Sequence, residues 1–98
     1  MYLKIHERSG QRVLAACDKE LIGKVLEEKG TTLDLDRYSA FYKGPPCTEK
    51  ALLSELPSAT SINLVGQKTV SAGLKSGLFA SGEVKYINGI PHIQLYRI

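Results

Sequence analysis

Several signatures of large functional classes are missing from this 98-residue sequence. No apolar run approaches the roughly 20 residues with which a helix crosses a bilayer, which argues against a helical membrane protein. The opening stretch MYLKIHERSG alternates apolar and polar residues and carries charge throughout, unlike a secretion or organelle-targeting signal. We therefore expect a cytoplasmic protein without a membrane partner.

Cysteine and histidine are scarce, with two of each in the chain. Cys17 and Cys47 do not form a CxxC pair, and two such cysteines in a cytoplasmic chain are most simply reduced thiols. His6 and His92 lie far from them and from each other, without the short local spacing of zinc modules. We expect no metal site and no cofactor.

The loops and nucleophile motifs of common enzymes are also absent. There is no GxGxxG, and GLKSG has the composition of a Walker loop in the wrong order. Neither cysteine carries a local catalytic signature, and Asp34 and Asp36 share a strand face that alternation alone explains. No residue is assigned as catalytic. An enzyme with a site near Gly66 and His92 is the least favoured alternative, because it requires both regions to reach one pocket.

What is present is the composition of an ordinary folded domain. With 43% hydrophobic and 23% charged residues, the chain reads as one domain, residues 1–98, without repeats or low-complexity tracts. The net charge of +3 and the sequence pI of about 8.9 favour polyanionic partners over acidic ones.

Apolar periodicity and turn residues predict the order ββαβαβαββ. Strands are expected at 2–7 and 12–18, then a helix over 19–30 that Asp18 begins, then a strand at 31–36 and an extended segment at 37–46. A helix over 49–56 capped by Thr48, a strand at 60–66, a helix over 67–77 and a hairpin over 83–98 complete the order. Gly73 inside the third helix suggests close packing against another element. The fold class is α/β, bordering on α+β, with one mixed sheet of about six strands and about three helices.

The final hairpin has a definite predicted register. A two-residue Asn-Gly turn makes Ile87 and Ile90 the hydrogen-bonded closing pair, so the donor that Pro91 lacks points away from its partner strand. Alternation then sends one set of side chains toward the core and the other to a polar face. If the last strand also pairs with the first, the polar face includes Tyr2, Lys4, His6, Lys85, His92, Gln94 and Tyr96.

A second candidate site is the turn NLVGQK, where a strand leads through a glycine into a helix. Free amides and the positive end of the helix dipole can hold an anion there. The candidate residues are Asn63, Gly66, Gln67 and Lys68. The simpler interpretation is that Gly66 only serves the turn between strand and helix.

The stretches SINLVGQKTV and SGLFASGEVKYINGIPHIQLYRI and the opening MYLKIH resemble an archaeal family of small proteins known as domain of unknown function, number 424. The resemblance extends over essentially the whole chain. It implies an archaeal cytoplasmic protein grouped with RNA-binding or translation-linked proteins. It implies no established activity and draws attention to Asn63, Gly66, Pro91 and His92.

These observations lead to two interpretations of function. Aromatic side chains interleaved with cations on a strand face are typical of single-stranded RNA binding, which favours a non-enzymatic RNA-binding or ribosome-associated module. An ordinary solvated sheet face would show the same pattern. The alternative is an interaction module that binds another protein through an open sheet edge or an apolar groove.

Overall fold

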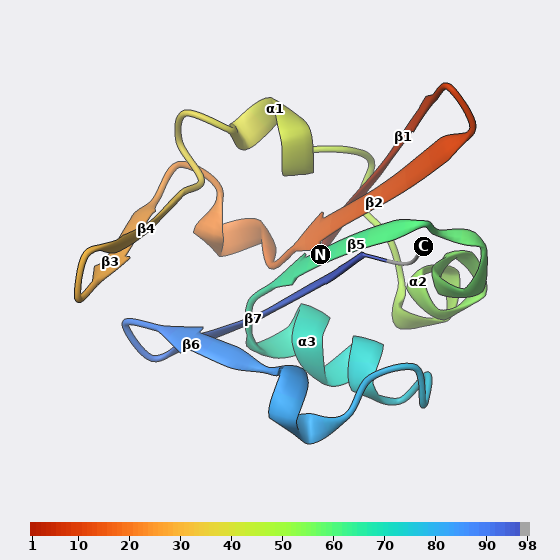
Figure 1. The fold of residues 1–98 in the computed structure, drawn as a ribbon. Helices are drawn as coiled ribbons and strands as arrows, with labels where there is room; N and C mark the ends of the chain where they lie inside the picture. Colours follow the sequence, from red (N-terminus) through yellow and green to blue (C-terminus); the bar gives the residue numbers. More distant parts are fainter. Residues whose placement is uncertain (97–98) are drawn as a thin grey trace.

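A five-stranded mixed sheet forms the centre of the computed structural model, which describes residues 1–96. The strands in spatial order are β1 (Tyr2–Arg8), β2 (Gln11–Cys17), β5 (Ser61–Val65), β7 (Ile90–Tyr96) and β6 (Lys85–Ile87). β2 and β5 are parallel, and every other neighbouring pair is antiparallel (Figure 1). The predicted class, a mixed sheet with antiparallel hairpins at both ends, is confirmed.

One side of the sheet, the helix face, carries α2 (Glu49–Glu55) and α3 (Gln67–Leu74). Thr48 begins α2 as predicted, because its hydroxyl accepts a 3.1 Å hydrogen bond from the amide of Ala51. The side chains that alternate toward these helices are apolar and form the larger core. Its fully buried members are Leu14, Ala16, Leu52, Leu56, Ile62, Leu64 and Ile93.

The other side, the groove face, is only partly covered. Over it lie α1 (Ser39–Tyr42) and a separate hairpin of β3 (Val25–Glu28) and β4 (Thr31–Asp34). Figure 1 shows these two elements on one side of the sheet strands, with α3 on the other. They bury a second core against β2 and β5, built around Ala15, Cys17, Leu21, Leu26, Leu35, Tyr42 and Val65.

The predicted helix over 19–30 is wrong. After a single 3-10 turn at Lys19–Leu21, the chain forms β3 and turns through Lys29 and Gly30, which have φ angles of 49° and 82°. Glu28 then pairs with Thr31 across this two-residue turn. The buried side chains are Leu21 and Leu26, whereas Val25 is 49% exposed, so the apolar residues follow strand alternation.

Three smaller differences complete the architecture. The segment 37–46, predicted to be extended, contains the short helix α1. The strands number seven within residues 1–96, in two sheets rather than one. The third helix ends at Leu74, and the final two residues of the predicted last strand lie outside the described part. No helix within residues 1–96 combines the length and apolar character needed to cross a bilayer.

Candidate nucleic-acid interface

The groove face is organised in rows that follow the strand register. One row runs from Lys4 through Ala15 and Asn63 to Gln94. One further row lies on each side of it. These are Tyr2, Cys17, Val65, His92 and Lys85 on one side, and His6, Val13, Ser61 and Tyr96 on the other. The seven predicted face residues therefore share one side of the sheet.

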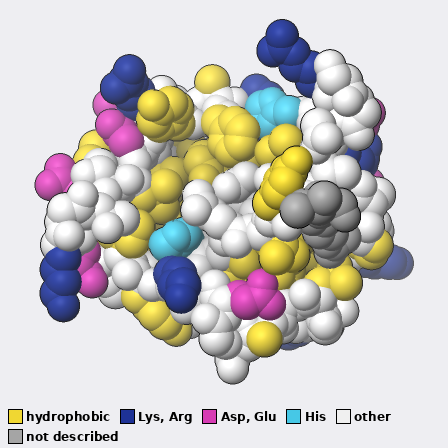
Figure 2. Space-filling model, in the orientation of Figure 1, with side chains coloured by type: hydrophobic (Ala, Val, Ile, Leu, Met, Phe, Trp, Pro, Cys, Tyr) yellow, Lys and Arg dark blue, Asp and Glu magenta, His cyan; other side chains and the backbone are white. Residues whose placement is uncertain are grey.

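The predicted neighbourhood of the first and last strands is wrong. β7 pairs with β5 and β1 pairs with β2, so two strands separate Tyr2, Lys4 and His6 from the polar residues of β7. Figure 2 shows the consequence: the two histidines of the chain lie apart, with hydrophobic side chains gathered between them.

The residues of β1 hold α1 in place. The ammonium group of Lys4 donates a 2.8 Å hydrogen bond to the carbonyl of Ala40. The Nε2 atom of His6 lies 2.9 Å from the carbonyl oxygen of Phe41, and the two rings stack with centroids 4.7 Å apart. These contacts give Lys4 and His6 a structural role in positioning the aromatic residues of α1.

Asn63 and Gln94 form a polar pair at the centre of the face. They are opposite each other on β5 and β7. In the same register Gly66 lies opposite Pro91, and the Gly66 amide donates a 2.9 Å hydrogen bond to the Pro91 carbonyl, so that pair is a hydrogen-bonded one. Alternation makes Asn63 and Gln94 a non-hydrogen-bonded pair, with Cα atoms about 4.5 Å apart and side chains adjacent. Neither side-chain amide has a hydrogen-bond partner among residues 1–96.

Aromatic side chains surround this pair and form the aromatic pocket, with a volume of about 350 Å³. Tyr38 is 55% exposed, and the guanidinium of Arg37 lies 5.6 Å from the centre of its ring. Phe41 meets Tyr42 edge to face at 5.1 Å. Burial raises the pKa of Tyr42 to about 12, with a further contribution from Cys17. The lining residues are Leu33, Asp34, Tyr38, Phe41, Tyr42, Asn63 and Gln94.

A second pocket, the lysine pocket, lies between the β3–β4 hairpin and the β6–β7 hairpin. Its volume is about 380 Å³, and its lining residues are Glu28, Lys29, Thr31, Lys85, Tyr86, Ile87 and His92. Glu28 accepts a 2.8 Å hydrogen bond from the amide of Asn88, which joins the two hairpins. The pocket therefore holds two lysines and one carboxylate that is already engaged by a main-chain amide.

The environment of His92 favours the neutral form of its ring. Burial, with the charge of Lys85 as a second cause, lowers its pKa from the ordinary value of 6.5. Its Nδ1 atom is buried without a hydrogen-bond partner among residues 1–96. A neutral ring with its proton on Nε2 would leave a lone pair, and not an N–H, buried at Nδ1, which is the less costly arrangement.

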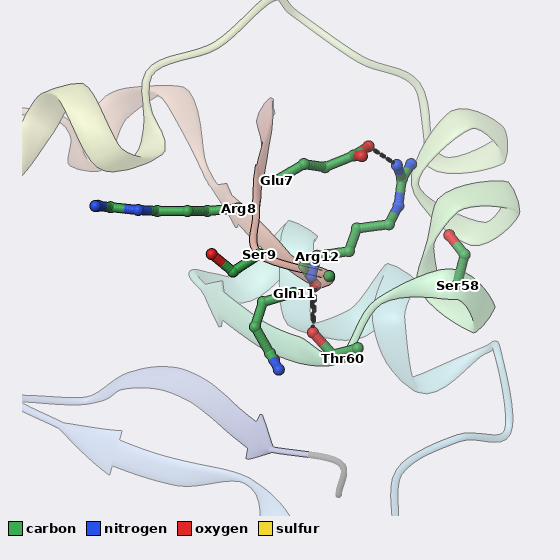
Figure 3. Close-up of a pocket in the computed structure, with 8 residues that line it drawn as sticks. Glu7, Arg8, Ser9, Gln11, Arg12, Ser58 and Thr60 are labelled. Carbon is green, nitrogen blue, oxygen red and sulfur yellow. Dashed lines mark hydrogen bonds and ion pairs between the residues drawn. The ribbon is translucent and has the colours of Figure 1, made fainter.

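A third pocket lies beside the β1–β2 turn, where Figure 3 shows its lining side chains. Arg12 forms ion pairs with Glu7 and Glu55, and its amide donates to the Thr60 hydroxyl at 2.8 Å. The side chain of Arg8 extends away from this group (Figure 3). The charges of Glu7 and Arg12 are already paired, so this pocket is a weaker candidate than the groove face.

The predicted anion-binding turn already holds a carboxylate from the chain itself. Asp18 is buried and accepts hydrogen bonds from the amides of Lys68 at 3.1 Å and Thr69 at 2.8 Å. Gly66 has a φ of 109°, and a Cβ there would lie 2.4 Å from the Asp18 carboxyl carbon. The free helix end expected beside Gln67 is thus satisfied internally.

Gly66 and His92 do not face a common pocket. The main chains are close, since Val65 pairs with His92. However, α3 leaves Gly66 toward the helix face, while the His92 side chain lies on the groove face. Within residues 1–96 no three metal-ligating side chains converge either.

The fold and these pockets define a small α/β protein with a polar and aromatic sheet face. Residues 6–98 match the model of the family described as "Protein of unknown function (DUF424)", so the chain belongs to that family. It is similar to an uncharacterized conserved protein from Methanopyrus kandleri, known from a crystal structure. The two are 29% identical, with a TM-score of 0.82, over 99% of this chain and 90% of the other. No curated protein matches the chain.

The walls of the aromatic pocket were not predicted as site residues. Tyr38, Phe41 and Tyr42 lie in the segment RYSAFY, which was interpreted only as an extended stretch. Three aromatic residues within five positions are unusual in a chain with 7% aromatic residues, and this clustering was the available signal.

Proposed function

We propose that this protein binds single-stranded RNA through the groove face, as a non-enzymatic module that acts with the translation apparatus. The observation that carries the proposal is the Asn63–Gln94 pair, two unpartnered amides beneath the aromatic residues of α1. Asparagine is depleted in strands. If the position of Asn63 served only the sheet, a β-branched residue would suit it better. Amides beside aromatic rings suit unstacked bases, which stack on rings and offer hydrogen-bonding edges.

The basic side chains around the groove face support a polyanionic partner, whereas the carboxylates of Asp34 and Glu28 there accept main-chain hydrogen bonds. Lys29 and Lys85 border the lysine pocket, and Arg37 lies against Tyr38. Cations beside stacking surfaces are the usual combination in proteins that bind single strands. Duplex RNA fits less well, because its bases are already stacked and its major groove is too narrow for side chains.

Fluorescence anisotropy with a labelled single-stranded oligoribonucleotide tests the proposal. We expect binding that weakens with salt and exceeds binding to a duplex of the same length. Lys29→Ala combined with Lys85→Ala should lower affinity and reduce the salt slope by about 0.7 for each lost phosphate contact. The charge-matched control is Lys50→Ala with Lys75→Ala, on the helix-face elements. Equal losses in the two double variants, or equal affinity for single strand and duplex, would refute the assignment.

One observation favours protein binding as a second candidate. β6 pairs only with Ile90, Pro91 and His92, so the main chain of Gln94 and Tyr96 faces an edge without a strand partner among residues 1–96. A peptide strand could add there. Protection of the Gln94 and Tyr96 amides from hydrogen exchange by a protein ligand, and not by RNA, would favour this candidate.

A further inference from the structure

The aromatic pocket and the lysine pocket lie next to each other along β4 and β7, and we infer that they are the two ends of one groove. β4 lines both, with Thr31 in the lysine pocket and Leu33 in the aromatic pocket. β7 does the same, with His92 in one and Gln94 in the other. The two residues of each pair are two positions apart on their strand, so their Cα atoms lie about 7 Å apart along it. A single sugar can bridge that distance between a base and its phosphate.

The aromatic end has the chemistry of a base site. Tyr38 and Phe41 provide apolar ring surface, and the adjacent Asn63 and Gln94 amides each offer donors and an acceptor. Its volume of about 350 Å³ lies within the roughly 300–1,000 Å³ typical of small-molecule sites. The amide groups lack partners among residues 1–96, so a base edge would satisfy them without breaking an existing bond.

The opposite end has the chemistry of a phosphate site. Lys29 and Lys85 supply ammonium groups from two different hairpins, and Thr31 supplies a hydroxyl. His92 also lines this pocket, and in its neutral form one ring nitrogen can donate without adding a second positive charge beside Lys85. Glu28 is the one opposing charge in the pocket, and its Oε1 atom is engaged by the Asn88 amide.

Building on the proposed function, we propose that the groove holds one unstacked ribonucleotide of the bound strand. Its base lies at the aromatic end against Tyr38 and the Asn63–Gln94 amides. Its phosphate lies at the lysine end between Lys29 and Lys85. The groove thus recognises one nucleotide, while the rest of the RNA strand crosses the surface of the sheet.

The test is an NMR titration of the full chain with AMP, GMP, CMP and UMP, with the matching nucleosides and with inorganic phosphate. We expect at least one monophosphate to shift amide resonances at both ends, those of Thr31 and His92 together with those of Leu33 and Gln94. The nucleoside should bind about tenfold more weakly, because it lacks the charge-assisted contacts.

Two variants separate the ends of the groove. Lys29→Ala with Lys85→Ala should weaken monophosphate binding about tenfold and leave nucleoside binding unchanged. Gln94→Ala, at an exposed position, should weaken both and alter the preference among the four bases. Lys50→Ala with Lys75→Ala is the charge-matched control and should change neither.

Resonance shifts confined to one pocket would overturn the single-nucleotide site. The same conclusion would follow if nucleoside and phosphate bound together and the monophosphate displaced neither. The absence of shifts at about 10 mM monophosphate would overturn the site as well. Oligonucleotide binding that Gln94→Ala leaves unchanged would overturn it while sparing the proposed RNA function. Monophosphate binding at both ends without oligonucleotide binding would support the site and refute that function.

Discussion

The carboxylate of Asp18 accepts two hydrogen bonds from Thr69, 51 positions later in the chain: one from the amide at 2.8 Å and one from the hydroxyl at 2.7 Å. A residue at the end of β2 thereby caps α3, whose own N-cap position is Gly66 and has no side chain to do so. The contact joins the end of β2 to α3, the helix that follows its parallel neighbour β5.

Asp18→Ala should lower the free energy of unfolding by about 3 kcal/mol, because it leaves the buried Thr69 hydroxyl and two helix amides without an acceptor. Urea denaturation followed by circular dichroism measures the change. Asp36→Ala, at an exposed carboxylate, is the control and should stay within about 0.5 kcal/mol of the parent. Equal midpoints for the two variants would contradict the capping role.

Gly73→Ala should destabilise the protein although alanine favours helix by about 1 kcal/mol. A Cβ at Gly73 would lie 2.4 Å from the Cδ1 atom of Leu64, a side chain that is fully buried. Overpacking of this kind costs about 1–3 kcal/mol. Gly82→Ala is the matched control, since no atom lies within 4 Å of its added Cβ. A Gly73→Ala variant more stable than the parent would show that Leu64 can move aside.

His92 should titrate below its ordinary pKa of 6.5, because burial and then Lys85 disfavour its charged form. An NMR titration of the ring protons measures this directly. Lys85→Ala should raise the pKa of His92 part of the way, leaving the contribution of burial in place. An unchanged pKa in Lys85→Ala would exclude the electrostatic contribution.

The same shift predicts how stability depends on pH. As pH falls below about 6.5, the unfolded chain takes up a proton at His92 before the folded chain does, so unfolding becomes easier. The loss levels off once the pH is below the folded-state pKa. Comparing unfolding of the parent and His92→Gln between pH 5 and 8, about the range in which histidine titrates, isolates this contribution. Parallel curves would contradict it.

The two cysteines should differ sharply in reactivity. Cys17 is fully buried, and burial followed by the charge of Asp18 raises its pKa to about 12. Cys47 is half-buried, and burial raises its pKa as well. In single-cysteine variants, a disulfide-exchange reagent should modify Cys47 in the native protein, and Cys17 only as the protein unfolds. Equal native rates would mean that the core around Cys17 opens readily.

Local patterns were enough to predict much of the sheet. The Asn88-Gly89 turn and the alternation around it gave the β6–β7 register, and Ile87 does pair with Ile90. Pro91 lies opposite Gly66, next to the last pair of the β5–β7 ladder. Its missing donor is not needed there, because the Gly66 carbonyl accepts a 2.9 Å hydrogen bond from the Val70 amide instead. Gly73 was correctly interpreted as a point of close packing.

What failed depended on contacts between distant residues. Asp18 precedes a plausible helix, yet its carboxylate caps α3 instead. The neighbouring apolar residues Val25 and Leu26 point to opposite sides of β3, one exposed and one buried. The hairpin that forms there is held by the β6–β7 hairpin, as the hydrogen bond from the Asn88 amide to Glu28 illustrates. The aromatic pocket likewise needs Phe41 and Tyr42 of α1 to lie near Asn63 of β5 and Gln94 of β7, an arrangement that no local pattern reveals.

The segment that follows α1 limits aggregation of the protein through the edge of its sheet. Pro45 accepts a 3.2 Å hydrogen bond from the Leu3 amide, Cys47 donates one of 2.9 Å to Met1, and Pro46 bridges to Tyr2. This short stretch lies along the outer edge of β1, and its two prolines offer no N–H to a further strand. Edge-to-edge growth into aggregates is therefore blocked at the start of β1, where the sheet would otherwise present its first strand to solvent.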